Sequence, residues 1–263
     1  MEKFKFKKSF GQNFLKDKNV IKNIVLKTNI LPNSLIIEVG PGSGVLTKEL
    51  ASVAKNVLAY EIDERLEEVL DENLKDFHNI DIIYDDFLNR DILNDIKKYE
   101  YENIYFIANL PYYITTPIIV KLIESKIDFK TITVMVQKEV ADRFMASPKT
   151  RNYGSITVFL NYYYDISKLL FVSSSAFVPK PNVDSMVIAL KQKDHKLKVV
   201  NEEFFFKLVR DAFKYKRKNI RNNLKNYDLD KILTVLEKYH KDLTVRAEEL
   251  DLEIFVDLAN NLV

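Results

Sequence analysis

The feature that most constrains the fold of this chain is a glycine-rich turn between an apolar segment and a helix-like one. The apolar run 35–39 predicts a buried strand, and residues 45–50 predict a helix. Between them, residues 40–44 read Gly-Pro-Gly-Ser-Gly and hold three of the five glycines in the chain. Glycine accepts positive φ and lets backbone approach a ligand closely. The spacing differs from the Gly-x-Gly-x-x-Gly of dinucleotide sites, which argues against a pyrophosphate ligand.

Acidic side chains follow the next two predicted strands. The runs 56–60 and 80–84 end in Glu61 and Asp86. Ligands of open α/β sheets bind at the carboxyl ends of the strands. An acid about twenty residues after the glycine turn can accept hydrogen bonds from both ribose hydroxyls. A carboxylate at the following strand end can accept one from an adenine amino group. Each acid alone could be a solvated strand end, but together they indicate a nucleoside site.

A fourth strand end carries the sequence Asn109-Leu110-Pro111-Tyr112, directly after the apolar run 104–108. The Asn109 side-chain carbonyl and the next backbone carbonyl can both accept hydrogen bonds from one amino group, and Pro111 fixes the turn that aims them. Tyr112 offers a flat face on which a flipped-out base can stack. An ordinary turn ending in an aromatic residue is the alternative. The neighbouring strand ends favour a clamp for an exocyclic amino group.

With these motifs the chain resembles the S-adenosylmethionine-dependent adenine methyltransferases. More narrowly, it resembles the small-subunit (16S) rRNA adenine dimethyltransferases of the KsgA family. The narrower signals are Phe-Gly-Gln-Asn-Phe-Leu at 10–15 and the Ala-Phe-x-Pro-x-Pro-x-Val-x-Ser loop at 176–185. The resemblance implies a Rossmann-like methyltransferase sheet, of α/β class, with a small all-helical C-terminal domain. Motifs that carry it span nearly the whole chain, at 10–15, 38–44, 61–63, 86–87, 109–117, 136–143, 175–185, 217–224 and 246–250.

The resemblance also implies roles for individual residues. Asn109 and the Leu110 carbonyl would hold the two amino hydrogens of the target adenine out of the ring plane, while Tyr112 and Phe177 would sandwich the base. No strong base is needed, because the sulfonium methyl is highly electrophilic and the proton leaves after attack. Cofactor contacts would come from Asn13 and Leu15 (covering S-adenosylmethionine), Gly40 (methionine part), Glu61 (ribose), Asp86 (adenine) and Asn109 (between the two ligands).

Charge is distributed unevenly on a chain whose formal net charge is only +2. Lysines cluster near the start, and acids concentrate at 64–76 and 85–95. Such segregation indicates a polyanion-binding face, although a charge run can also be only a solvated surface. A second basic cluster falls on a helix expected at 216–225. We expect RNA phosphate contacts from Lys214, Lys216, Arg217, Lys218 and Arg221.

The order of predicted elements indicates two domains. Strands and helices alternate from residue 35 to about 190, including strands expected at 156–164 and 186–190. A lysine-rich linker follows, and then only helical patterns. We expect a catalytic domain at 1–190, in which the basic segment 1–16 carries the cofactor-covering motif, a linker at 191–200 and an RNA- or ribosome-contacting domain at 201–263. Helices of that last domain are expected at 202–213, 216–225, 229–239 and 247–261.

Composition agrees with a cytoplasmic enzyme. The chain has no cysteine, so it forms no disulfide and no thiolate metal site. No apolar stretch approaches the ~20 residues of a membrane span, and the basic start lacks the apolar region of a signal peptide. The three histidines lie outside every motif. We expect no metal, no membrane partner and a monomer.

The function expected from the resemblance is dimethylation of two adjacent adenosines in the 3′-terminal hairpin of 16S rRNA. The amino groups would be modified during 30S ribosome biogenesis, with S-adenosylhomocysteine as the product and the immature 30S particle as partner. One alternative is a large-subunit rRNA adenine methyltransferase that confers antibiotic resistance. Another is a non-catalytic ribosome-assembly factor on the same fold. The motif at 10–15 and the C-terminal basic cluster favour the first function.

Overall fold

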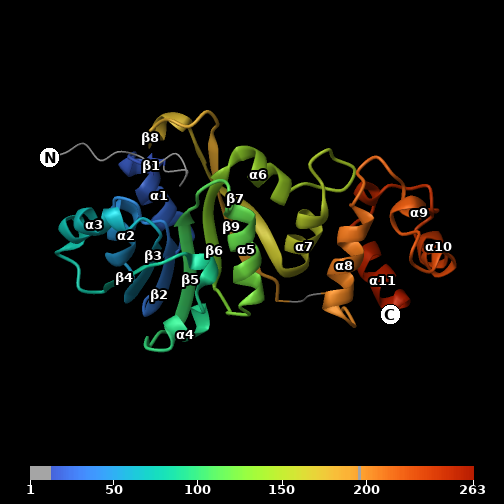
Figure 1. Cartoon of the computed structure of the whole chain (residues 1–263), viewed down its shortest axis with the longest axis horizontal. Helices are drawn as coiled ribbons and strands as arrows, with labels where there is room; N and C mark the ends of the chain where they lie inside the picture. Colours follow the sequence, from blue (N-terminus) through green and yellow to red (C-terminus); the bar gives the residue numbers. More distant parts are fainter. Residues whose placement is uncertain (1–12, 195–196) are drawn as a thin grey trace. The chain divides into compact units, whose positions relative to one another are not determined.

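The computed structural model describes residues 13–194 and 197–263 (Figure 1). The chain divides into two compact units. The sheet unit contains the residues up to Ala141 and Ser167–Gln192. The helical unit contains Asp142–Ile166 and Lys193–Val263.

A seven-stranded sheet forms the centre of the sheet unit, with the strand order β4-β3-β2-β5-β6-β9-β7. The five strands from β4 to β6 run parallel, and β9 pairs antiparallel with β6. The order reverses beside β2, whose neighbours are β3 and β5, so the ends of β2 and β5 flank the switch point where ligands bind in such sheets. The strands are β2 (Ser34–Val39), β3 (Asn56–Glu61), β4 (Ile80–Tyr84), β5 (Asn103–Asn109), β6 (Thr131–Gln137), β7 (Tyr164–Val172) and β9 (Ser185–Gln192).

The central strands are mostly apolar because helices cover both faces of a parallel sheet. All six residues of β2 are buried, and Ile36 pairs with Val57 on one side and Tyr105 on the other. Helices follow the strands along the chain, as expected from the sequence. They are α1 (Lys18–Thr28), α2 (Val45–Ala51), η2 (Glu64–Leu66), α3 (Glu67–Leu74), η3 (Phe87–Asn89), α4 (Ile92–Ile96), α5 (Thr115–Glu124) and α6 (Lys138–Phe144).

A second, two-stranded sheet joins the start of the described chain to a distant loop. Strand β1 (Phe14–Leu15) pairs antiparallel with β8 (Phe177–Val178), which follows the short helix η4 (Ser174–Ala176). Figure 1 shows β1 and β8 next to each other. The Asp17 side chain accepts hydrogen bonds from the first turn of α1, so the chain turns into a helix directly after β1. This pairing determines where residues 13–15 lie.

The helical unit has a hydrophobic core of its own. Phe205, Leu236 and Phe255 are fully buried in this core. Residues Tyr153, Val158 and Tyr162 also belong to it, although they precede β9 in the sequence. The helices are α7 (Ser155–Tyr163), α8 (Glu202–Ala212), α9 (Ile220–Asn223), α10 (Leu229–Lys238), η5 (Ala247–Glu249) and α11 (Leu252–Leu262).

The strand expected at 156–164 was wrong, because this segment is helix α7. Its β-branched and aromatic residues favour a strand by propensity, but Val158 and Tyr162 lie four residues apart and share one helical face. That face is buried in the core of the helical unit. The expected domain division changes for the same reason. The second unit does resume at Lys193, yet it also takes residues 142–166 from the segment assigned to the catalytic domain.

Candidate active site

A pocket opens at the carboxyl ends of β2, β3, β4 and β5, where the sequence predicted a ligand site. Its cavity volume is about 180 Å³. Residues from four strand ends and from β1 line it, including Asn13, Leu15, Glu38, Gly40, Gly42, Glu61, Ile62, Asp85, Asp86, Asn109, Leu110, Pro111, Tyr112 and Tyr113. All six residues expected to bind a cofactor therefore face one cavity.

The glycine turn after β2 needs glycine for its backbone conformation and for space. Gly40 and Gly42 have φ values of +73° and +60°, which favour glycine. A Cβ atom on Gly42 would lie 2.5 Å from the Phe14 ring. The Gly40 amide donates to the Tyr60 carbonyl over 2.9 Å, which ties the turn to β3. The turn thus brings backbone to the pocket wall without a side chain in between.

Glu61 holds this turn and keeps acceptor capacity for a ligand. Its Oε2 accepts a hydrogen bond from the Gly42 amide (3.2 Å), and its Oε1 accepts one from the Asp63 amide (2.9 Å). The residue is buried, and burial raises the pKa of its carboxyl while hydrogen bonds from the backbone of Asp63, Gly42 and Ile62 oppose that rise. A carboxylate has about four lone-pair sites, so acceptor capacity remains for a hydroxyl donor such as that of a ribose.

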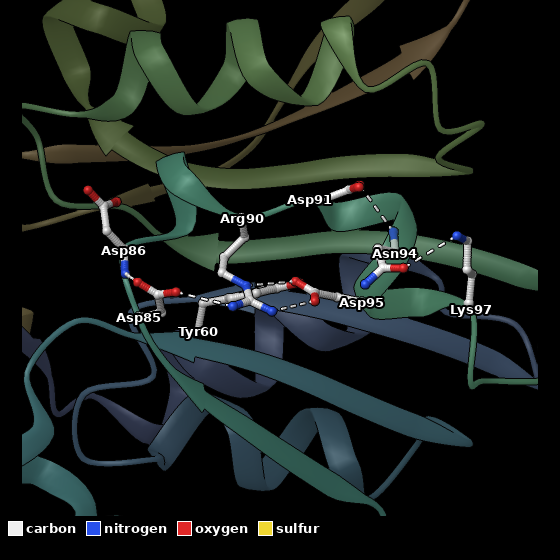
Figure 2. A network of polar contacts seen from close by, with 8 residues as sticks. All are labelled: Tyr60, Asp85, Asp86, Arg90, Asp91, Asn94, Asp95 and Lys97. Carbon is white, nitrogen blue, oxygen red and sulfur yellow. Dashed lines mark hydrogen bonds and ion pairs between the residues drawn. The ribbon is translucent and has the colours of Figure 1, made fainter.

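Asp86 lies two residues beyond the end of β4, with one carboxylate oxygen already engaged. Its Oδ1 accepts a hydrogen bond from the Leu88 amide over 2.9 Å and so caps η3. Figure 2 shows its carboxylate directed away from the neighbouring Asp85 and Arg90. Phe87 is buried behind it, edge-on to Tyr60 at a ring-centroid distance of 5.1 Å. The Asp86 carboxylate thus keeps oxygen lone pairs that can accept a hydrogen bond from an amino group.

Asn109 is the last residue of β5, and its amide group crosses toward β1. Its Nδ2 donates to the Asn13 carbonyl over 3.4 Å, so its Oδ1 is the atom that can accept from a substrate amino group. The Leu110 amide donates to the Met135 carbonyl of β6. The Tyr112 hydroxyl hydrogen-bonds to Ser185 Oγ over 2.8 Å, which fixes the ring at the first residue of β9. The expected clamp therefore has its three groups in one turn at the pocket.

Phe177 is not among the residues that line the pocket, and the expected stacking on the target base stays a prediction. It pairs with Leu15 across the β1–β8 ladder, and both side chains are buried in the same hydrophobic cluster. Directly opposed side chains of an antiparallel pair lie on the same face, which here is the core face. Phe177 therefore packs with Leu15 in the hydrophobic core and stabilises the position of the Asn13–Leu15 segment.

The basic cluster belongs to the helical unit, and all five expected RNA-contacting side chains are exposed. The helix expected at 216–225 is shorter, because α9 starts only at Ile220. The Asn223 side chain donates to the Ala212 and Tyr215 carbonyls and holds the preceding residues in turns. Lys216 Nζ donates to the Arg151 carbonyl over 2.7 Å. The loop that carries exposed Lys149 and Arg151 therefore lies beside this cluster.

Glu38 is a pocket residue to which the sequence analysis assigned no role. It lies on β2 two residues before Gly40, is 1% exposed, and its Oε2 has no hydrogen-bond partner among the described residues. Burial raises the pKa of Glu38 to about 8, and the Glu61 carboxylate adds to the rise. A carboxylate inside a strand that is otherwise apolar was the sequence signal for it. Tyr113, exposed beside Tyr112, was also missed.

The described residues contain no group of three or more side chains that could hold a metal ion. Within the same residues, no helix is both long and apolar enough to cross a membrane.

These features define the class of the protein. The backbone turn, an acid with acceptor sites for a ribose, an acid for an adenine and an amide clamp fit a nucleoside sulfonium cofactor beside an amino-group substrate. The class is that of S-adenosylmethionine-dependent methyltransferases of exocyclic amino groups. Residues 3–262 match the profile of the family described as "Ribosomal RNA adenine dimethylase". The chain belongs to this family and is an rRNA adenine dimethyltransferase that uses S-adenosylmethionine.

Curated relatives agree over almost the full length. "Ribosomal RNA small subunit methyltransferase A" of Alkaliphilus oremlandii is 46% identical over 265 residues, which cover 98% of this chain and 92% of the relative. The protein of the same name from Bacillus cytotoxicus is 43% identical over 270 residues, covering 99% and 92%.

Solved structures agree with the fold. A dimethyladenosine transferase from Plasmodium falciparum has a TM-score of 0.78 and 26% identity, covering 93% of this chain and 95% of that one. The 23S rRNA methyltransferase ErmE has a TM-score of 0.73 and 28% identity, covering 95% and 99%. The expected family, Rossmann-like fold, enzyme class and cofactor are thereby confirmed. The roles of single residues stay predictions.

We predict that Glu38→Gln changes how the stability of the cofactor-free protein depends on pH. A carboxyl with an ordinary pKa of 4.5 and a folded pKa of about 8 stays protonated in the folded state while the unfolded chain ionises. Its contribution to the free energy of unfolding is therefore full below pH 4.5 and is lost as the pH rises toward 8. Glutamine has no such loss. The free energy of unfolding of Glu38→Gln minus that of wild type should therefore increase from pH 5 to pH 8, by an amount on the order of a few kcal/mol.

Chemical denaturation of the cofactor-free protein at several pH values measures this difference. The control is Glu68→Gln, which removes an exposed carboxyl of α3. A difference between Glu38→Gln and wild type that does not change with pH would contradict the prediction.

Proposed function

We propose that this enzyme dimethylates two adjacent adenosines in the 3′-terminal hairpin of small-subunit rRNA during assembly of the 30S particle. The observation that carries the proposal is the near full-length similarity, at 42–46% identity, to proteins named small subunit methyltransferase A. The partners are the rRNA and the immature 30S particle, the enzyme acts as a monomer, and its location is the cytoplasm.

In the proposed reaction, the pocket positions the amino group and makes it nucleophilic. The lone pair of an adenine amino nitrogen is delocalised into the ring. Asn109 Oδ1 and the Leu110 carbonyl accept hydrogen bonds from its two hydrogens and hold them out of the ring plane, so that the lone pair is localised. Tyr112, fixed by Ser185, offers the stacking surface for the base. S-adenosylmethionine supplies an electrophilic methyl group, and the amino proton leaves to solvent after attack.

We propose cofactor contacts from residues that line the pocket. Glu61 would bind the ribose hydroxyls, Asp86 would bind the adenine amino group, and Gly40 would contact the methionine part. Asn13 and Leu15 cover the cofactor from β1. Asn109 sits between cofactor and target base, since its Nδ2 already reaches the Asn13 carbonyl.

Large-subunit rRNA is the second candidate substrate, because the structure of the 23S rRNA methyltransferase ErmE is similar over 95% of this chain. Methyl transfer to immature 30S particles, 50S particles and free rRNA tests the two, with the modified positions mapped by primer-extension stops. Transfer to 30S particles with stops at two adjacent adenosines supports the proposal, whereas transfer to the large subunit refutes it. Absence of any transfer of labelled methyl would favour a non-catalytic assembly factor.

We predict that Asn109→Ala leaves the protein folded and lowers the single-turnover rate about a hundredfold or more. The reason is the loss of one of two positioned acceptors for the amino hydrogens. Thermal unfolding and cofactor binding report on the fold. The control is Asn94→Ala, which removes an exposed asparagine side chain of α4. A rate near that of wild type would show that Asn109 is not part of the clamp.

We predict that Glu61→Gln weakens cofactor binding about 10- to 100-fold and changes RNA binding little. A charge-assisted hydrogen bond is worth about 1.5–3 kcal/mol, and the substitution removes the charge that faces the ribose. Calorimetric titration with S-adenosylhomocysteine measures the effect. The exposed neighbour Glu64, changed to Gln, is the matched control. Unchanged cofactor affinity in Glu61→Gln would refute the ribose contact.

We predict that Arg217→Gln with Arg221→Gln reduces the salt dependence of binding to 30S particles. Each lost phosphate contact lowers the steepness of log Kd against log salt by about one, so the double variant should lose about one to two. Cofactor affinity should not change. The control pair Lys198→Gln with Lys231→Gln removes the same charge from exposed positions outside the cluster. An unaltered slope in the arginine variant would leave the basic cluster without a role in RNA binding.

A further inference from the structure

A polar network connects Tyr60 and Asp85, the residues that directly precede the two acids that the proposed function assigns to the adenosine part of the cofactor (Figure 2). Its centre is Arg90, which follows η3. Arg90 pairs with both oxygens of Asp95, through Nε at 3.1 Å and Nη2 at 2.6 Å. Its Nη1 donates to Asp85 Oδ2 over 3.2 Å. The Tyr60 hydroxyl donates to Asp95 Oδ2 over 3.0 Å. One guanidinium thus connects two carboxylates from different elements.

The two ends of this network stand next to the adenosine-binding acids in the sequence. Tyr60 directly precedes Glu61 at the end of β3. Asp85 directly precedes Asp86, and its Oδ1 accepts a hydrogen bond from the Asp86 amide over 2.7 Å. One Asp85 oxygen therefore contacts Arg90, and the other contacts the backbone that carries the Asp86 carboxylate. The network links the position of Asp86 to that of Glu61.

Other contacts support the same loop without linking the two acids. Lys121 Nζ from α5 donates to the Leu88 carbonyl over 3.0 Å, and the Phe87 ring packs on Tyr60. The Arg90 contact differs because it also neutralises a charge. Asp85 and Asp86 are adjacent carboxylates, and a cation shared with Asp85 lowers their repulsion. Arg90 forms its ion pairs with Asp85 and Asp95 and not with Asp86. The Asp86 carboxylate is therefore left to face the pocket.

We infer that Arg90 is a positioning residue that sets Asp86 relative to Glu61 and thereby gives the cofactor site its selectivity for the adenine amino group. The inference rests on the proposed roles of Glu61 and Asp86. An amino-group contact tolerates little displacement, because hydrogen bonds weaken steeply with distance and angle. A guanidinium suits this role better than an ammonium, since it holds one carboxylate in a two-pronged pair and still reaches a second one.

Two cofactor-product analogues that differ at one group test the inference. S-adenosylhomocysteine carries the adenine amino group, and S-inosylhomocysteine carries an oxygen in its place. We expect wild type to bind the first about tenfold or more tightly, because Asp86 faces an acceptor in the second. Asp86→Ala should abolish the preference. Arg90→Gln should lower it at least about fivefold, and Arg90→Lys should give an intermediate value. Calorimetry with the full-length enzyme supplies the dissociation constants.

Matched tyrosine variants separate positioning from general stability. Tyr60→Phe removes one hydrogen bond from the network and should lower the preference partly. Tyr99→Phe removes a similar bond, from the Tyr99 hydroxyl to Asp81 Oδ2 at 2.5 Å, near the opposite end of β4. It should leave the preference unchanged. Each variant is measured at a temperature that lies equally far below its own unfolding midpoint. If Arg90→Gln unfolds, Arg90→Lys takes its place in the comparison.

The outcomes distinguish failure of the inference from failure of the proposed function. A preference that stays at the wild-type value in Arg90→Gln and Arg90→Lys, with both analogues weakened equally, overturns the positioning role and leaves Asp86 as the adenine contact. A wild-type enzyme without preference refutes the adenine contact of Asp86, and the role of Arg90 is then refuted with it. A preference reduced by Arg90→Gln and Tyr60→Phe, but not by Tyr99→Phe, supports the inference.

Discussion

Parallel pairing of β2 with β3 on one side and β5 on the other is the interaction on which the active site depends. Because the three strands run in the same direction, their carboxyl ends meet at one edge. That edge brings together the glycine turn, Glu61 and Asn109, which are separated by up to about seventy residues in the sequence. The register also lets Gly40 bond to the Tyr60 carbonyl. Buried apolar strands therefore decide the geometry of the polar groups.

Carboxylates at this edge do several tasks at once. Glu61 accepts from the turn that follows β2, and Asp86 caps η3, so each acid supports backbone as well as facing the pocket. Asp85 forms an ion pair with Arg90, whereas Glu38 is buried beside the turn and has a raised pKa. Neighbouring acids thus differ in burial and in hydrogen-bond partners, and burial raises the pKa of both Glu38 and Glu61. These different surroundings let several acidic side chains occupy one small site.

The helical unit carries the basic cluster of Lys214, Lys216, Arg217, Lys218 and Arg221, and the sheet unit carries the pocket. Asn223 holds the turns that present Lys214 to Lys218, and Lys216 ties them to the Arg151 loop. A cluster of this kind contacts phosphates and sets orientation without reading bases. Under the proposed function, substrate choice would combine two steps, docking through the helical unit and capture of one amino group by Asn109 and Leu110 in the sheet unit.

The sequence by itself determined the strand ends and their side chains, because buried strands, glycine turns and the Asn-Leu-Pro-Tyr motif are local patterns that need no knowledge of distant partners. It therefore predicted Gly40, Glu61, Asp86 and Asn109 at one site. Only the tertiary structure decided whether Val158 and Tyr162 form a helix and whether Phe177 reaches the pocket. Propensity favoured a strand for the first segment, and the core of the helical unit overrode it. Phe177 pairs with Leu15, about 160 residues away, and such long-range pairing leaves no local signal.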